Sequence, residues 1–152
     1  MTAVSPSNHP VFYKGAVVHM ATGIFYAHSG WRYVVIVLLV IAIVKMLIGL
    51  LNRGRWDNLD EWLNRLTPIS IDIQFLLGLI LWIMQQRWTG IDPVASWEHP
   101  VTMLIATIVA HATQRRTRVA PTDASKYQTA LIGYLITGLI VAVGVARITE
   151  VL

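Results

Sequence analysis

The sequence predicts an all-α integral membrane protein whose four transmembrane helices form one bundle. Hydrophobic residues make up 55% of the 152 residues and charged residues only 13%, roughly half the charged fraction of a soluble domain. The run from Tyr33 to Leu51 contains a single charged residue, Lys45, and its length suits a hydrocarbon core about 30 Å thick. Three more apolar runs follow. We therefore expect one membrane domain over residues 1–152, with spans at about 28–51, 69–87, 93–114 and 123–149.

The first span has an N-terminal approach whose conformation the sequence leaves open. Residues 1–15 contain two prolines and a lysine and predict a loose tail. Residues 16–27 are apolar but include Gly23, which is compatible with either an interfacial segment or a helical extension of the span. The start lacks the basic stretch and apolar core of a cleavable signal peptide. We expect the first long apolar run to remain as a membrane anchor.

A short amphipathic helix is predicted on the membrane surface between spans one and two. Apolar residues there recur at helical spacing, at Leu59, Trp62, Leu63 and Leu66. Asn58 followed by Glu61 resembles a capping box, and Pro68 is expected to end the segment. A helix lying on the membrane fits this pattern, and the alternative is an ordinary connecting turn.

The third span begins near Pro93 and contains a second proline. Asp92 before Pro93 is typical of a helix start, and Pro100 predicts either a kink or a short helix followed by a new start. The loops at 52–67 and 112–126 carry seven basic residues against four on the opposite side. The excess predicts that both loops lie in the cytoplasm and both termini outside.

Two histidines at similar predicted depth are the candidate cofactor ligands. His28 opens the first span and His99 opens the third, and both lie on the outer side of the predicted topology. Histidines from different helices of a four-helix bundle can serve as the two axial ligands of a b-type haem. Arg32, one turn after His28, is placed to pair with a haem propionate. The alternative is that both histidines are hydrogen-bonding residues at the membrane interface.

Three polar residues form a second layer near the cytoplasmic boundary: Lys45, Asp72 and His111. Lys45 and Asp72 are expected to form a structural ion pair with His111 hydrogen-bonded beside it, because an unpaired charge at this depth is costly. The functional alternatives are a proton path or a quinone headgroup site. The middle of spans one to three carries almost no polar residue, which argues against a complete proton channel.

Several function classes find no support in the sequence. There is no cysteine, so cysteine-ligated iron–sulfur clusters and haem attached through Cys-x-x-Cys-His are excluded. Phosphate-binding loops and the common hydrolase motifs are absent. The basic residues lie in loops between apolar runs, which favours a topology signal over nucleic-acid binding.

Small residues repeat every four positions in the fourth span, at Gly138, Ala142 and Ala146. Such a stripe allows helices to approach closely. It either packs the bundle on itself or offers a face for a second copy or another membrane subunit.

The motifs His28-Ser29-Gly30-Trp31-Arg32-Tyr33, Gln74-Phe75-Leu76-Leu77-Gly78-Leu79 and Glu98-His99 before Met103 resemble those of small bacterial four-helix membrane proteins labelled cytochrome b-like. The similarity in order and spacing extends over roughly residues 24–148. It implies a multi-pass protein of the bacterial cytoplasmic membrane with b-type haem at His28 and His99. Asp72 stands where some members carry histidine, which argues against a second haem.

The sequence thus predicts membrane electron transfer through a haem, with a quinone or a partner complex as the candidate electron partner. The competing hypothesis is a cofactor-free accessory or anchoring subunit of a respiratory or photosynthetic complex. Either reading favours an electron carrier or subunit over a stand-alone enzyme. A small-molecule transporter is less favoured, because the spans lack a polar lining and broken helices.

Overall fold

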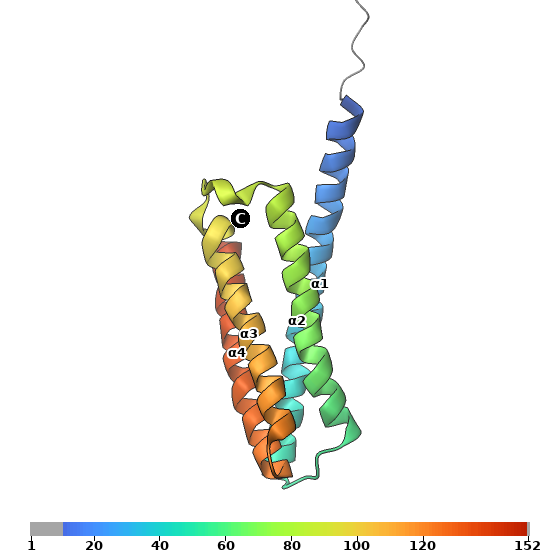
Figure 1. The fold of residues 1–152 in the computed structure, drawn as a ribbon, viewed down its shortest axis with the longest axis vertical. Helices are drawn as coiled ribbons and strands as arrows, with labels where there is room; N and C mark the ends of the chain where they lie inside the picture. Colours follow the sequence, from blue (N-terminus) through green and yellow to red (C-terminus); the bar gives the residue numbers. More distant parts are fainter. Residues whose placement is uncertain (1–10, 152) are drawn as a thin grey trace, which may run out of the picture.

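A computed structural model describes residues 11–151, and that part of the chain is 89% helical without strands. Four long helices run α1 (Val11–Leu51), α2 (Asn58–Met84), α3 (His99–Val119) and α4 (Asp123–Val151). A 3₁₀ turn at Arg87–Thr89 and a π-helical turn at Val94–Glu98 connect α2 to α3. Figure 1 shows the helices packed side by side with alternating direction. The all-α, four-helix prediction is confirmed.

The two ends of the bundle differ in composition, and we name them accordingly. The basic end holds the α1–α2 and α3–α4 connections, at the bottom of Figure 1, with Arg53 and Arg55 in the first of them. The tryptophan end, at the top, holds the α2–α3 connection, with Trp88 and Trp97.

Three of the helices are long and apolar enough to cross a membrane: Val18–Leu51 of α1, Asn58–Met84 of α2 and Asp123–Thr149 of α4. Apolar side chains also cover much of their outer surface, as expected for helices that face lipid. On α2 a single outward stripe repeats at spacings of three and four, at Leu59, Trp62, Leu66, Ile69, Ile73, Leu76, Ile80 and Ile83. The structure is therefore compatible with a membrane protein, with three helices that could cross a bilayer.

Each helix also carries an inward stripe at the same spacing. On α1 the buried positions are Val35, Leu39, Ala42 and Met46. On α3 they are Ala106, Ala110, Thr113 and Thr117. This spacing places the side chains on one face of a helix, and the alanines allow the four backbones to approach closely. Continued toward the tryptophan end at the same spacing, the two stripes reach His28 on α1 and His99 on α3.

Helix α1 begins earlier than the sequence predicted. Residues 16–27 continue the span as helix, which resolves the open alternative. Residues 11–15 are also helical, so the loose-tail prediction is wrong for them, and residues 1–10 lie outside the described part of the chain. As Figure 1 shows, α1 projects past the other helices at the tryptophan end.

The predicted surface helix is wrong, because residues 58–66 are the first turns of α2. The apolar stripe that suggested a surface helix is the beginning of the outward stripe of α2. Pro68 does not end the segment. It removes the N–H that would bond the Asn64 carbonyl, and the Tyr134 hydroxyl donates to that oxygen at 3.0 Å instead. The lost helical bond is thus replaced from α4.

The helix caps also differ in detail. Asp57 and Asp60 form the capping box of α2, one residue before the predicted pair Asn58 and Glu61. At the start of α3, the chain passes through the π-helical turn and continues as α-helix from His99, with Pro100 in the first turn. Pro100 has no N–H for the carbonyl of Ser96 four residues earlier, and the Trp82 indole donates to that oxygen at 2.7 Å instead.

Close contact between helices relies mainly on glycines outside the predicted stripe. A Cβ added at Gly49 would collide with the Tyr127 ring, and one at Gly133 would collide with Thr113. Gly138 lies beside Ile43 of α1, whereas Ala142 and Ala146 are exposed. Only the first residue of the predicted stripe therefore packs within the bundle.

Candidate functional site

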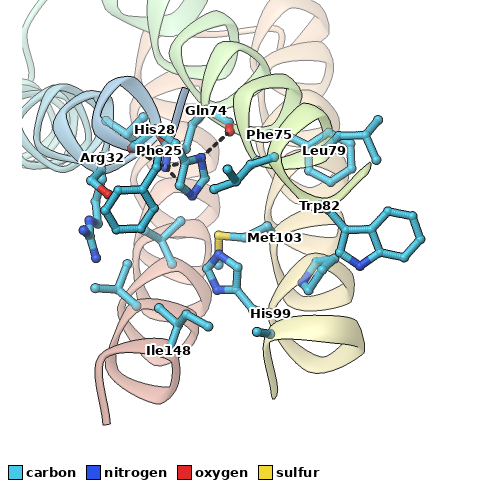
Figure 2. Close-up of a pocket in the computed structure, with 18 of the residues that line it drawn as sticks. Phe25, His28, Arg32, Gln74, Phe75, Leu79, Trp82, His99, Met103 and Ile148 are labelled. Atoms are coloured by element: carbon cyan, nitrogen blue, oxygen red, sulfur yellow. Dashed lines mark hydrogen bonds between the residues drawn. The ribbon is translucent and has the colours of Figure 1, made fainter. Parts of the chain in front are cut away.

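A mostly apolar cavity of about 170 Å³ lies between the four helices toward the tryptophan end. Side chains from all four helices line it (Figure 2), and both candidate histidines are among them. The structure thus brings His28 and His99 into the same cavity, together with Arg32. Lys45, Asp72 and His111 do not line it.

His28 is held by α2. Its Nδ1–H donates to the main-chain oxygen of Gln74 at 3.2 Å. The Gln74 amide nitrogen donates to the main-chain oxygen of His28 at 3.1 Å. That nitrogen also lies 3.2 Å from His28 Nδ1 and 3.3 Å from Nε2. The Gln74 amide therefore contacts both ring nitrogens, and it would have to move for Nε2 to bind a metal.

His28 lies deeper than the sequence indicated. Its partner Gln74 is ten residues before the end of α2 at Met84, which is about 15 Å along the helix. His28, predicted to open the first span, therefore does not lie at the start of its helix. The reason is the longer α1, which begins at Val11 and places His28 well inside the helix.

His99 is held by α4 in an equivalent way. Its Nδ1–H donates to the main-chain oxygen of Gly144 at 3.0 Å, and a Cβ at Gly144 would collide with Met103. Glu98, the residue before His99, pairs with Arg147 at 2.7 Å. Main-chain oxygens, not carboxylates, therefore orient both rings.

The two imidazoles face each other across the cavity (Figure 2). Their ring centroids are 6.3 Å apart and their planes are nearly perpendicular, at 85°. A metal–imidazole bond is about 2 Å long and the ring centre lies about 1 Å beyond the nitrogen, so two imidazoles on opposite sides of one metal ion have centroids about 6 Å apart. The observed separation agrees with that requirement, and it is also the separation of an ordinary edge-to-face ring contact.

Two polar atoms in the cavity wall are buried without hydrogen-bond partners, Arg32 Nε and Gln74 Oε1. The Arg32 guanidinium also lies 5.8 Å from the centroid of the Tyr33 ring. An unsatisfied buried donor and acceptor are costly. Both atoms are therefore candidate contacts for a ligand with polar groups.

Gly78 and a tryptophan cluster shape the rest of the site. A Cβ at Gly78 would lie 2.9 Å from His28 Cε1, so glycine allows the ring to rest against α2. Trp82 packs edge-on against Trp88 and Trp97, with centroids 5.6 Å apart in each pair. The Trp82 indole also donates to Ser96 O at 2.7 Å. These contacts connect α2 to the turn before His99.

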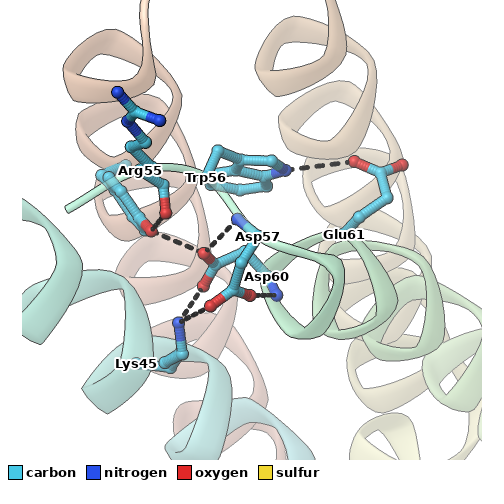
Figure 3. Close-up of polar contacts among 7 residues, drawn as sticks. Lys45, Arg55, Trp56, Asp57, Asp60 and Glu61 are labelled. Atoms are coloured by element: carbon cyan, nitrogen blue, oxygen red, sulfur yellow. Dashed lines mark hydrogen bonds and ion pairs between the residues drawn. The ribbon is translucent and has the colours of Figure 1, made fainter.

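The predicted polar cluster near the basic end is wrong in its pairing. Lys45 contacts Asp60 at 2.7 Å and Asp57 at 3.3 Å (Figure 3). Asp72 pairs with His111, whose Nε2 lies 2.8 Å from Asp72 Oδ1, on the outer surface of α2 and α3. Because α2 begins at Asn58, its first turn reaches Lys45, whereas Asp72 lies almost four turns further on.

Sequence reasoning missed the roles of Gln74, Gly78 and Asp60. Gln74 and Gly78 lie one turn apart on α2, facing His28. A polar residue and a glycine at i and i+4 in an apolar run were a signal for this contact. Asp60 offered no such signal, because its burial depends on α2 extending to Asn58.

Comparison with known protein families, curated proteins and solved structures finds no match for this chain.

Proposed function

We propose that this protein binds a b-type haem between His28 and His99 and transfers electrons within a membrane. The observation that carries the proposal is the pair of facing imidazoles. Each Nδ1–H is fixed on a main-chain oxygen, and the centroids are 6.3 Å apart in one apolar cavity. A hydrogen bond from Nδ1–H to a main-chain oxygen fixes the tautomer of each ring and assigns Nε2 as the nitrogen that would bind the iron.

The number of protein donors also favours haem. Among the described residues, no group of three or more metal-ligating side chains of the His, Cys, Asp and Glu types comes together. Two imidazoles are sufficient for haem iron, because the porphyrin supplies the other four nitrogens. When bound, the haem would supply reversible one-electron chemistry, and a quinone or a partner complex would exchange electrons with it.

The remaining polar groups fit the edge of a haem. Arg32, with its unpartnered Nε, would bind a propionate, and Gln74 would hold His28 in place. A cavity of about 170 Å³ is close to the size that holds one aromatic ring, so a porphyrin requires flanking side chains to turn away. Phe25 and Leu79 line the cavity and are more than a third exposed. Their movement would cost little core packing.

The proposed function includes a four-span topology, in which α3 also crosses the membrane, in addition to α1, α2 and α4. Its 21 residues extend about 31 Å, and it packs between α2 and α4. The seven-to-four excess of basic residues supports a cytoplasmic basic end and both termini outside. We place the protein in a bacterial cytoplasmic membrane on the resemblance described above.

A second candidate function is a cofactor-free subunit of a larger membrane complex. The specific observation is that His28 links α1 to α2 and His99 links α3 to α4 through hydrogen bonds. Both histidines would then be structural. Ala142 and Ala146, which are exposed on α4, would offer a face for another subunit or a second copy.

The test is the absorption spectrum of protein purified after expression with ample haem. We expect a reduced b-type spectrum that disappears in His28→Ala and in His99→Ala. His111→Ala is the matched control, because His111 lies outside the cavity, and it should keep the spectrum. Colourless wild-type protein that co-purifies with larger subunits would reject the haem proposal in favour of the second candidate.

A further inference from the structure

A second polar site lies inside the bundle near the basic end, around Pro68, where α2 lacks one main-chain hydrogen bond. Asn64 of α2, Thr117 of α3 and Tyr134 of α4 are all completely buried. The Tyr134 hydroxyl lies 3.0 Å from the Asn64 main-chain oxygen and 2.8 Å from its side-chain oxygen. We call these three residues the Asn64 chamber.

The three residues lie near one contact between α2, α3 and α4. Tyr134 contacts Asn64 directly. Arg118, the neighbour of Thr117, lies 3.7 Å from Glu61, which is almost one turn before Asn64, and both of these charges act on Tyr134. Thr117 and Asn64 therefore flank the same contact between adjacent helices.

Two atoms of the chamber have no protein partner, Asn64 Nδ2 and Thr117 Oγ1. Thr117 is unusual in this respect. Seven other helical threonines donate to a carbonyl four residues earlier, namely Thr22, Thr67, Thr102, Thr107, Thr113, Thr137 and Thr149. The Thr117 hydroxyl makes no such bond, although a helix offers that bond readily. Its proton is available to something else.

We infer that the Asn64 chamber binds one ordered water molecule. Asn64 Nδ2 would donate to it, Thr117 Oγ1 would exchange a hydrogen bond with it, and the Tyr134 oxygen has a lone pair that can accept from it. Two to four polar partners are what a buried water needs. A larger or charged ligand does not fit, because all three side chains are fully buried and neutral.

The chamber is separate from the histidine cavity and does not depend on haem. Apolar side chains lie between the two sites on every helix: Leu39 and Ala42 on α1, Ile71 on α2, Ala106 and Ala110 on α3, and Val141 on α4. The water would therefore stabilise α2 near Pro68 by forming hydrogen bonds with the polar groups around that proline.

The test compares hydration and stability in the full-length, haem-free chain in detergent micelles. Nuclear magnetic resonance should detect cross-peaks between a long-lived water and the Asn64 side-chain amide. Thr117→Val should abolish them and lower the denaturation midpoint, because it removes a water ligand. Thr117→Ser keeps the hydroxyl and should keep the cross-peaks.

Thr113→Val is the matched control, since the Thr113 hydroxyl is already bonded to Val109 O, and it should leave the cross-peaks in place. A dry chamber gives the opposite result. The wild type would then show no cross-peaks, and Thr117→Val would raise the midpoint by removing an unpaired hydroxyl. Cross-peaks that persist in Thr117→Val would also overturn the inference.

Discussion

The histidine cavity and the Lys45 cluster, which consists of Lys45, Asp57, Asp60 and Tyr127, are both polar sites within an apolar bundle. They differ in how completely their polar atoms are paired. In the Lys45 cluster, the Asp60 carboxylate contacts Lys45 Nζ at 2.7 Å, the Tyr127 hydroxyl at 2.5 Å and the Asp57 N–H at 2.9 Å. In the cavity, Arg32 Nε and Gln74 Oε1 are buried without partners.

This difference separates a structural site from a candidate binding site. A buried charge is tolerated when every hydrogen bond around it is made, and the Lys45 cluster meets that condition while joining α1, α2 and α4. The cavity leaves a donor and an acceptor unsatisfied beside two oriented imidazoles. Such groups are retained at a cost to stability, which is the expected property of a site that is completed by a ligand.

The largest expected effect is the loss of Asp60. Asp60 is fully buried, and Asp60→Ala leaves the Lys45 ammonium without its closest partner and the Tyr127 hydroxyl without its carboxylate. Lys45 is partly exposed and keeps Asp57 as a partner, so the main cost is the loss of hydrogen bonds to a buried carboxylate, about 1.5–3 kcal/mol. We expect a decrease of that size in the free energy of unfolding, measured by denaturation in detergent micelles.

Asp57→Ala is the matched control for Asp60→Ala. The Asp57 side chain is 55% exposed, and its loss removes mainly a helix cap, worth about 1 kcal/mol. Equal effects of the two substitutions would contradict a buried cluster centred on Asp60.

A smaller effect is expected from Gly78→Ala in the cavity. The added Cβ would lie 2.9 Å from His28 Cε1, so the ring must shift from its position on α2. Overpacking of this kind costs about 1–3 kcal/mol. If His28 binds haem iron, Gly78→Ala should also lower haem occupancy, measured from the ratio of haem to protein absorbance.

Gly30→Ala provides the comparison, because a Cβ there meets nothing within 4 Å. This substitution should be neutral or stabilise α1 by up to about 1 kcal/mol. Haem occupancy unchanged in both variants would show that the position of His28 against Gly78 has no role in binding.

The sequence predicted the all-α class and the four helices, because long apolar runs bounded by charged residues leave few alternatives. It failed at Pro68, where local propensity predicts a helix end. The Tyr134 hydroxyl replaces the missing bond from a position 66 residues later in the chain, and that contact is visible only in three dimensions. The error at Pro68 produced the false surface helix and the false partner for Lys45.

The residues of the candidate site lie together in one cavity, whereas the haem assigned to them stays a prediction. His28, His99 and Arg32 share one cavity, as the spacing along the inward stripes of α1 and α3 requires. The orienting groups were missed, since two of them are the main-chain oxygens of Gln74 and Gly144. A main-chain oxygen has no signature in the sequence, so the tautomer of each histidine is a property of the fold.

The smallest expected effect concerns the pH dependence of the Lys45 cluster. The N–H of Asp60, which donates to Asp57 Oδ1 at 2.9 Å, and the nearby Lys45 ammonium hold the pKa of the Asp57 carboxyl below its usual value of 3.8. A carboxyl whose pKa is lower in the folded state stabilises the protein fully above its unfolded pKa and loses this contribution as the pH falls through the folded pKa. We expect wild-type stability to decline slightly below about pH 4 through this group, and Asp57→Asn to lack that part of the decline. Denaturation midpoints at pH 3 to pH 6 would measure the difference.

Asp57 is exposed, and Asp60 supplies most of the binding to Lys45. A large change of the denaturation midpoint in Asp57→Asn above pH 5 would therefore show that the cluster depends on its exposed carboxylate instead of its buried one.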